Sequence, residues 1–367
     1  MKELIAAIPK SELHVHLRGA MPVPVFAELL LRHPVRDVWH GIPLHHRAWL
    51  LQYRNIRQFV RARHHTPESL PGLFRTTALF DFLATYALTG YFVRDVTDLR
   101  TVITGVLESL KRQKVVYAEI SISIPEYLRQ GIPLTGICAC LDEATSFPGI
   151  RVQWIVDLVR DLGPRAGLAL LNDILEMRCR SIVGITLGGS ERFFPPARFT
   201  QLYAAAQRNG LHRTVHAGEG LGPGSIRDAI RLLGVERIGH GVRAIEDTSL
   251  VAHMAEGRIP IEVCPTSNIR TGLYKSYAGH PLKALFEAGV PVSLNTDDPT
   301  FFGTTLVDEY VHLREMGLQE GAVLEIIKNG FRHAFLPERE IAQYLTDVDA
   351  AWASLAVRDR PEDHQAR

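Results

Sequence analysis

This sequence has few cysteines, no long apolar run and no excess of charge of one sign. Four cysteines occur among 367 residues, and the close pair Cys138 and Cys140 has a C-x-C spacing that matches no common zinc or redox motif. The longest uncharged hydrophobic stretch, Phe82–Val93, is far shorter than a membrane-spanning helix. The apolar residues 4–8 are too few for a signal peptide. These absences predict a cytoplasmic protein with reduced thiols and no membrane partner.

The charge balance argues against a second group of functions. Lys and Arg number 41 against 40 Asp and Glu, which gives a formal net charge of +1. A protein that binds nucleic acid or a membrane surface would usually carry a basic excess. The composition, 46% hydrophobic and 22% charged, is that of an ordinary globular protein. A small molecule is therefore the expected partner, and the oligomeric state stays open.

Four short segments each end in residues that bind metal or transfer protons. An apolar run, often with β-branched residues, precedes each of them, as expected where ligands stand at the carboxyl ends of strands. The polar groups are His14 and His16, then His216 and Glu219, then His240, and finally Asp297 and Asp298. Three histidines and a carboxylate can hold one zinc ion, which leaves a glutamate and a second carboxylate for proton transfer and substrate binding.

Short apolar runs that alternate with amphipathic segments predict an α/β fold, the (β/α)8 TIM barrel. The eight predicted strands are Glu12–Leu17, Val115–Ser123, Arg151–Val159, Ser181–Leu187, Arg213–His216, Arg237–His240, Pro260–Cys264 and Pro291–Asn295. Helices are expected between them, for example at Ser225–Leu233 and Thr248–Glu256. We expect a single hydrolase barrel domain over residues 1–357 and a disordered tail over residues 358–367.

The connection after the first strand, residues 18–114, is far too long for a single crossover helix. Its helical patterns are Pro24–Leu31, Asn55–Arg63, Leu70–Leu88 and Asp98–Gln113. We expect a helical insertion over the carboxyl face of the barrel, where it could act as a lid. Further helices are expected after the eighth strand, near Leu306–Met316 and Ala322–Phe331, with one more at the C-terminus.

The predicted strands place the metal-binding candidates at one face of the barrel. His14 and His16 share a side of their strand because side chains alternate with period two, so both can bind one ion. His216 ends the fifth strand, His240 ends the sixth and Asp297 follows the eighth, and catalytic groups of such barrels gather at these ends. Such ligands suit zinc, and an open position would hold a water molecule of lowered pKa. A lone histidine is more often structural, but several groups at several strand ends favour a shared site.

The fourth strand bears on the number of metal ions. Residues 181–189 contain no lysine, glutamate or aspartate, although a two-metal site in this type of barrel needs a bridging acidic or carbamylated group there. We therefore expect one zinc ion per chain. Iron or manganese stays possible, because sites built from nitrogen and oxygen ligands accept several metals.

The motifs resemble the adenosine deaminase family of the amidohydrolase superfamily. The matching segments run from residue 9 to about residue 335 and read PKSELHVHLRGAM, GITLGGSE, VHAGE, RIGHG, EVCPTSN and VSLNTDDP. The resemblance implies that zinc is bound by four residues, namely His14, His16, His216 and Asp297. It also implies a TIM barrel that acts on a purine nucleoside.

The same resemblance implies roles for residues that do not bind the metal. Glu219 would donate a proton to N1 of the purine, and His240 would orient the attacking water and help to deprotonate it. Asp298 would form a hydrogen bond with N7, and the backbone N–H of Gly189 would face N3. The chemistry agrees, because protonation of the ring makes the amino-bearing carbon electrophilic. Zinc-dependent base deaminases of another fold also combine a metal-activated water with a glutamate that is not a ligand.

The segment after the second histidine departs from the family pattern. It usually reads L-D-G, with the aspartate near the ribose 5′ end of adenosine, whereas Arg18 stands here. A guanidinium binds carboxylates bidentately, so Arg18 indicates an anionic 5′ substituent, as in aminodeoxyfutalosine, on which family relatives act. The alternative is that Arg18 faces solvent or pairs with an acid of the insertion such as Glu28. Thr186 and Ser190, where adenosine-specific members often have aspartates, also weaken the assignment of adenosine.

Three classes of function stay open from the sequence. The leading one is a deaminase of a 6-aminopurine nucleoside, with adenosine and adenine as alternatives to aminodeoxyfutalosine. Another amidohydrolase reaction, such as lactone or amide hydrolysis, is less consistent with Glu219 and Asp298, because a purine edge needs both. A non-catalytic binding protein or growth factor of the family would be marked by loss of a metal ligand or of Glu219, and all of these residues are present.

Overall fold

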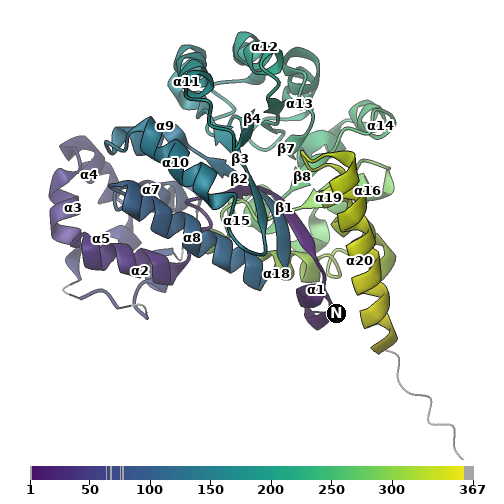
Figure 1. The fold of residues 1–367 in the computed structure, drawn as a ribbon, viewed down its shortest axis with the longest axis horizontal. Coiled ribbons are helices and arrows are strands. Elements are labelled where there is room, and N and C mark those ends of the chain that lie inside the picture. Colours follow the sequence, from purple (N-terminus) through teal and green to yellow (C-terminus); the bar gives the residue numbers. More distant parts are fainter. Residues whose placement is uncertain (1, 63, 67, 75, 77, 359–367) are drawn as a thin grey trace, which may run out of the picture.

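Parallel strands form the centre of the protein (Figure 1). The computed structural model describes residues 2–62, 64–66, 68–74, 76 and 78–358. The strands are β1 Lys10–His16, β2 Val115–Ile122, β3 Arg151–Asp157, β4 Ile182–Thr186, β5 His212–Arg213, β6 His216–Ala217, β7 Ile238–His240, β8 Ile261–Val263 and β9 Val292–Leu294. They form two ladders of parallel neighbours, β1 to β5 and β6 to β9, each in chain order.

Backbone hydrogen bonds join the two ladders at both edges, so the strands enclose a barrel. The N–H of His16 donates to the carbonyl of Asp297 at 2.9 Å, and the N–H of Asp297 donates to the carbonyl of His14 at 3.0 Å. At the other edge the N–H of His216 donates to the carbonyl of Leu187 at 3.3 Å. The predicted TIM barrel is confirmed, and the joins themselves bring together residues expected to bind metal.

The fifth predicted strand, residues 213–216, is divided in the structure. β5 pairs with β4, whereas β6 pairs with β7. Between them, the N–H of Thr214 donates to the carbonyl of Ile185 at 3.0 Å, while the carbonyl of Val215 accepts from the N–H of Gly239 at 2.8 Å. The N–H of His216 also donates to the carbonyl of Leu187 on the β4 side. The predicted segment is therefore extended with β4 on one edge and β7 on the other, and its regular strand pairing is interrupted at Thr214 and Val215.

Helices on the outside of the barrel follow the strands. The elements are α9 Ile124–Arg129, α10 Leu134–Ala144, η1 Arg160–Leu162, α11 Gly163–Met177, η2 Pro196–Phe199, α12 Thr200–Arg208, α13 Pro223–Asp228, η3 Ala229–Leu233, η4 Val242–Glu246, α14 Thr248–Glu256, α15 Pro265–Arg270, η5 Tyr277–Gly279 and α16 Leu282–Glu287. α14 has its predicted bounds, and its N-cap Asp247 accepts hydrogen bonds from the first turn. The helix predicted over Ser225–Leu233 is instead α13 followed by the π-helical turn η3.

The predicted helical insertion lies between β1 and β2, to the left of the strands in Figure 1. Its helices are α2 Val23–Arg32, α3 Val35–Gly41, α4 Leu44–Leu50, α5 Arg54–Arg61, α6 Pro71–Phe74, α7 Leu79–Gly90 and α8 Val96–Arg112. The sequence analysis missed α3 and α4, which begin after the extended residues Pro34 and Pro43. The single helix predicted over Leu70–Leu88 is wrong, since α6 and α7 replace it. The predicted end of α5 at residue 63 lies outside the described residues.

Helices near the two chain ends complete the protein. They are α1 Lys2–Ala7 before the barrel, and α17 Pro299–Phe302, α18 Leu306–His312, α19 Glu320–Arg332 and α20 Glu338–Arg358 after it. α20 lies on the side of the barrel opposite the insertion (Figure 1). The predicted tail, residues 358–367, lies outside the described residues apart from Arg358, at which α20 ends.

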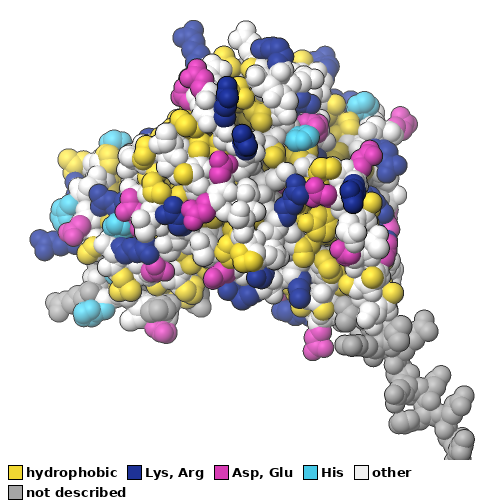
Figure 2. All heavy atoms as spheres, in the orientation of Figure 1, with side chains coloured by type: hydrophobic (Ala, Val, Ile, Leu, Met, Phe, Trp, Pro, Cys, Tyr) yellow, Lys and Arg dark blue, Asp and Glu magenta, His cyan; other side chains and the backbone are white. Residues whose placement is uncertain are grey.

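The surface and the thiols agree with the composition. None of the described helices combines the length and the apolar character needed to cross a bilayer. The four cysteines are buried free thiols. Figure 2 shows acidic and basic side chains interspersed over the face in view, in keeping with the formal net charge of +1.

Candidate metal centre

The ends of β1, β6 and β9 bring the four predicted metal ligands together. One ligand atom from each of His14, His16, His216 and Asp297 lies within 4.8 Å of all the others. Nε2 of His16 is 3.2 Å from Nε2 of His216 and 3.2 Å from Oδ1 of Asp297. Ligands at the corners of a zinc tetrahedron with bonds of about 2.0 Å stand roughly 3.3 Å apart. The spacing therefore fits one shared ion.

An orphaned nitrogen at the centre of the cluster also points to a metal. Nε2 of His14 is buried and has no hydrogen-bond partner among the described residues; its nearest carboxylate oxygen, Oδ1 of Asp297, is 3.6 Å away. Buried polar atoms nearly always have a partner, so this lone pair fits a bound cation. Within the described part of the chain, this is the one group of three or more potential ligands with metal-binding spacing.

A buried chain of charged groups, which the sequence analysis missed, supports His14 from behind. Nδ1 of His14 lies 2.8 Å from Oε2 of Glu262, and the other oxygen of Glu262 accepts from Nε of Arg237 at 2.6 Å. Arg237 also pairs with Glu119. A carboxylate on Nδ1 fixes the proton there and leaves Nε2 free for a metal. The signal that could have revealed this chain was Glu262 itself, an acid inside an otherwise apolar strand.

Asp297 is held in an unusual backbone conformation. Its φ of 63° lies in the left-handed region, which non-glycine residues rarely adopt. Hydrogen bonds to β1 fix its backbone, and the hydroxyl of Ser267 donates to Oδ2 at 2.6 Å. Burial would raise the pKa of Asp297, but the neighbouring His14 and His16 rings hold it well below its usual range. The carboxylate is therefore ionised, as a metal ligand must be.

His240 and Glu219 meet beside these ligands. Nε2 of His240 is 3.5 Å from Oε2 of Glu219 and 3.9 Å from Oδ2 of Asp297. His240 is almost fully buried, whereas the Glu219 side chain is 29% exposed on the loop after β6. One group thus faces the metal ligands and the other reaches toward solvent. A histidine and a carboxyl group so placed can move protons on a substrate between them.

Glu191 holds the loop that carries Glu219, a role that the sequence analysis did not find. Its two oxygens accept from the N–H of Gly218 at 2.9 Å and the N–H of Leu221 at 2.8 Å. The hydroxyl of Ser225 donates to the same carboxylate. Because Glu191 is buried, these bonds are protected from water and position the loop firmly. The GGSE segment contained this residue, but nothing local in the sequence indicated its partners.

Asp298 lies against Gly19 on the other side of the cluster. A Cβ atom on residue 19 would come within 1.8 Å of Oδ1 of Asp298, so glycine is required there. That oxygen is buried without a partner among the described residues. Burial, together with the neighbouring charge of Asp297, raises the pKa of Asp298 well above its usual range. Burial therefore favours the protonated form of Asp298, which can donate a hydrogen bond.

Gly189 stands on the loop that leaves β4, with a φ of 98°. A Cβ atom here would approach Oδ2 of Asp161 to 2.0 Å. The adjacent N–H groups of Gly188 and Ser190 donate to Asp157 and Asp161, each at 2.8 Å. The loop is therefore fixed by two carboxylates at the carboxyl end of the barrel. The predicted contact of Gly189 with a purine stays a prediction.

Arg18 takes neither of the alternative positions expected from the sequence. Its side chain is buried, and Nη2 lies 2.7 Å from Oε2 of Glu126 in α9. Its guanidinium carbon also lies 3.7 Å from the centre of the Tyr86 ring. Glu28, the acid named from the sequence, pairs with Arg32 instead. The partner was missed because α9 follows β2, about a hundred residues along the chain from Arg18.

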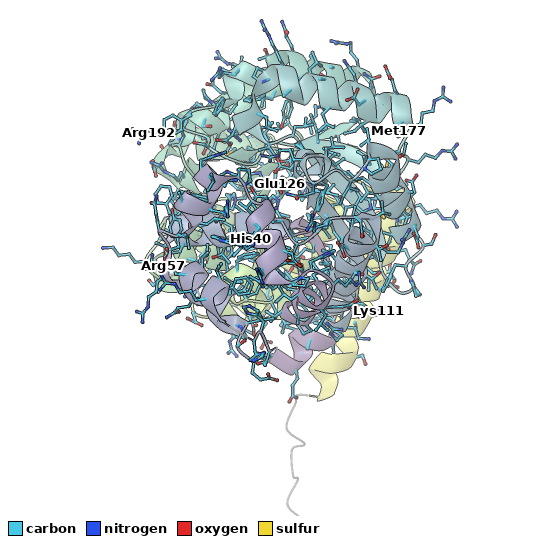
Figure 3. The ribbon with its side chains drawn as sticks, turned by 90° about the vertical axis from the view of Figure 1, so that its left-hand side faces the viewer. His40, Arg57, Lys111, Glu126, Met177 and Arg192 are labelled. Carbon is cyan, nitrogen blue, oxygen red and sulfur yellow. The ribbon has the colours of Figure 1, made fainter. Side chains whose placement is uncertain are left out.

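A cavity of about 480 Å³ is lined by Arg18 and by the insertion. Its charged and imidazole-bearing lining residues are Arg18, Arg94, Arg129, His45, His46 and Glu126. Figure 3 looks onto the insertion side and shows Glu126 near the middle of that face. Arg18, which follows the predicted ligand His16 by two residues, is the residue that this cavity shares with the β1 segment, and the lining carries more cationic groups than acids.

A barrel with histidines and an aspartate at its strand ends defines a metal-dependent hydrolase of the amidohydrolase type. Solved structures agree with this class. An adenine deaminase from Arthrobacter aurescens superposes with a TM-score of 0.81 at 28% identity, over 95% of this chain and 100% of that one. An amidohydrolase from Burkholderia ambifaria with bound Zn gives a TM-score of 0.78 at 25% identity, over 97% and 94% of the two chains.

The chain belongs to the adenosine deaminase family, whose model matches residues 50–351. It is 33% identical over 358 residues to the aminodeoxyfutalosine deaminase of Streptomyces coelicolor, which covers 95% of this chain and 86% of that protein. It is 34% identical over 343 residues to the adenine deaminase of Sinorhizobium fredii, which covers 91% and 96% of the two. The resemblance seen in the motifs is confirmed, and the chain is a hydrolytic deaminase.

Proposed function

We propose that this enzyme uses one zinc ion to deaminate a 6-aminopurine nucleoside with an anionic 5′ substituent, and that aminodeoxyfutalosine is its substrate. The observation that carries the substrate class is the cavity beside Arg18. Its volume of about 480 Å³ gives room for a substituent beyond the purine base, and Arg18 in its wall follows the predicted ligand His16 by two residues. Its arginines and histidines suit a carboxylate. The relative from Streptomyces coelicolor is named for the same substrate.

On this proposal, each step of the reaction is assigned to a particular residue. Zinc, held by the four ligands, would activate water and stabilise negative charge on its oxygen. Glu219 would protonate N1, and His240 would hold the attacking oxygen against the amino-bearing carbon. Asp298, kept protonated by burial, would donate to N7, and the backbone N–H of Gly189 would donate to N3. One water molecule is consumed, and the amino group departs as ammonia.

A free base is the second candidate, because the relative from Sinorhizobium fredii is an adenine deaminase. One feature of the site favours it. Arg18 already has a countercharge, since Glu126 lies 2.7 Å away, and a paired arginine attracts an anion less than a free one. If adenine were the substrate, the outer cavity would hold water. The two candidates therefore differ in whether Arg18 contributes to turnover.

The test compares kcat/KM for aminodeoxyfutalosine, adenosine and adenine in the wild type and in Arg18→Gln. We expect aminodeoxyfutalosine to be preferred in the wild type. Loss of a charge-assisted contact should lower its kcat/KM by roughly 10- to 100-fold, equivalent to about 1.5–3 kcal/mol. The value for adenine should change little. The double variant Arg18→Gln with Glu126→Gln separates loss of the anion contact from the cost of leaving Glu126 without its partner.

Arg192→Gln serves as the matched control, because Arg192 is exposed and lies at the rim of the face in Figure 3. It should leave all three values unchanged. Two results would contradict the anionic substituent. One is a wild type that prefers adenine, and the other is an Arg18→Gln variant in which turnover of adenosine and adenine falls as much as turnover of aminodeoxyfutalosine. Absence of turnover of any 6-aminopurine by the zinc-loaded protein would remove the deaminase proposal itself.

A further inference from the structure

The inner nitrogen of His240 belongs to a hydrogen-bond relay that leads away from the metal centre. Nδ1 of His240 lies 3.1 Å from Nδ2 of Asn268. Oδ1 of Asn268 lies 3.1 Å from Nε2 of His280. Nδ1 of His280 accepts from the backbone N–H of Leu282, at the start of α16, at 3.2 Å. The three side chains are at most 5% exposed, so water does not compete for these bonds.

The direction of every bond in this relay follows from its far end. A backbone N–H can only donate, so Nδ1 of His280 must accept from Leu282. A neutral His280 then carries its single ring proton on Nε2 and donates it to Asn268. The amide of Asn268 therefore presents its oxygen to His280 and its NH2 group to His240. The Nδ1 atom of His240 must accept, which leaves the ring proton of a neutral His240 on Nε2.

The reverse arrangement is excluded by the same geometry. If Asn268 were turned over, its NH2 group would face Nε2 of His280, and the ring proton of His280 would move to Nδ1. That proton would then confront the N–H of Leu282, with 3.2 Å between the two nitrogens. Protonation of both nitrogens of His280 is also disfavoured, because burial and the nearby His240 lower the pKa of His280 to about 3. One pattern of protons satisfies all four groups.

We propose that Asn268 and His280 are positioning residues that lock His240 in the Nε2–H tautomer, so that this ring offers a hydrogen-bond donor to the reacting centre. The inference rests on the proposed function for its catalytic consequence. The donor points to the side where Glu219 and Asp297 lie, at 3.5 Å and 3.9 Å from Nε2. His240 then orients the attacking oxygen by donating to it. Removal of a proton by Nε2 would first require a proton on Nδ1, which Asn268 opposes.

The tautomer can be measured without any turnover. The zinc-loaded protein is labelled with 15N in its histidine rings, and the signals of His240 are assigned by comparison with His240→Gln. We expect a pyridine-like signal for Nδ1 and a pyrrole-like signal for Nε2. A pyrrole-like Nδ1 in the wild type would overturn the proposal. This measurement needs no substrate, so its result tests the tautomer independently of the deaminase assignment.

Asn268→Asp reverses a single bond of the relay. A carboxylate keeps the shape of the amide and still accepts from His280, but it must also accept from His240. The proton of His240 should move to Nδ1, or both nitrogens should become protonated. With the proposed substrate we expect kcat to fall by about 10²-fold, a typical contribution of one proton-transfer or donor group, while KM and zinc content change little. Asn209→Asp, on the outside of α12 with its amide on the carbonyl of Ala205, is the matched control.

His280→Gln provides a second route if Asn268→Asp does not fold. A glutamine amide can still donate to Asn268, so the His240 signals should stay as in the wild type and kcat should be largely kept. His280→Leu removes that donor and should release Asn268 to turn over. Unchanged His240 signals in both Asn268→Asp and His280→Leu would show that the relay does not set the tautomer, and would overturn the proposal.

Discussion

The inner and outer ends of the site are built from different parts of the fold. The inner end consists of strand ends, and its ligands are fixed by backbone bonds between β1 and the segment after β9. The outer end consists of helices of the insertion and α9, where Arg18 pairs with Glu126. At the inner end, a buried chain in which Arg237 pairs with Glu262 supports His14. The difference teaches that the predicted metal ligands depend on the closure of the barrel, whereas the position of Arg18 depends on the packing of helices around it.

An aromatic cluster fastens the two ends together. The ring of Phe82 in α7 lies 4.9 Å from that of Phe302 and 5.6 Å from that of Phe301. Both partners belong to α17, which directly follows Asp298. Tyr86, one turn further along α7, also contacts Phe301 and lies under Arg18. Packing of α7 is therefore the physical link between the metal centre and the outer cavity.

Removal of a ligand from the inner end should have the largest effect. In His216→Ala we expect kcat/KM to fall by roughly 10³-fold or more, because several kcal/mol of charge stabilisation by the metal are lost. Zinc content after dialysis should fall as well, as measured by atomic absorption. His253→Ala, on the exposed face of α14, is the control. A His216→Ala protein that keeps both zinc and turnover would break the assignment of this end as the reaction centre.

The link between the two ends comes next in size. Phe82→Ala removes a ring that is 9% exposed, and such a change in a packed core costs about 3–5 kcal/mol. Phe80→Ala, two residues earlier on α7 but 65% exposed, should cost less than about 0.5 kcal/mol. Urea unfolding monitored by circular dichroism measures both. KM should rise in Phe82→Ala, because α7 carries the wall of the outer cavity.

Equal stabilities of the two phenylalanine variants would contradict this view of the insertion. The helices would then be loosely attached, and the two ends would be independent. A fall in kcat without a change in KM would also be informative, because it would place the effect of α7 at Asp298 rather than at the outer cavity. Whether KM or kcat changes therefore shows whether α7 acts on the outer cavity or on Asp298.

Most of the inner end could be predicted from the sequence, because strand periodicity and side-chain chemistry are local properties. His14, His16, His216 and Asp297 were assigned to strand ends, and the structure brings them within 4.8 Å of one another. Their supports were not predicted. Glu262, Glu191 and Asn268 contact His14, Gly218 and His240, which lie 248, 27 and 28 residues away in the chain, respectively. Such partners are set by the closure of the barrel and leave no pattern in their own segment.

The outer end was predicted less well for a related reason. Arg18 was singled out from its motif, but its partner was expected within the insertion and is Glu126 instead. The helices α3 and α4 are short, and each starts after a proline that interrupts the periodicity. Marginal helices of seven residues are stabilised mainly by tertiary contacts. The shape of the cavity that they line therefore depends on packing that the sequence pattern does not describe.

Glu309 offers the smallest test, and it concerns a buried acid that is held by neutral donors. This fully buried residue of α18 accepts from the hydroxyl of Thr304 at 2.8 Å and the N–H of Thr266 at 3.2 Å. Burial raises the pKa of Glu309 from its ordinary 4.5 to about 7. Below about pH 4.5 the carboxyl is protonated in both the folded and unfolded states, so its contribution to stability is complete. Between pH 4.5 and 7 the unfolded state ionises first, so that contribution is lost as pH rises.

Glu309→Gln should remove this pH dependence, because the amide stays neutral. Relative to the wild type, the variant should gain stability as pH rises from 5 to 8, by on the order of 3 kcal/mol, given 1.36 kcal/mol for each pKa unit. Chemical unfolding of the zinc-saturated proteins at both pH values measures the gain. Glu320→Gln, an exposed acid at the start of α19, should show none. A parallel response of Glu309→Gln and wild type would mean that Glu309 is ionised in the fold and that neutral donors alone stabilise its buried charge.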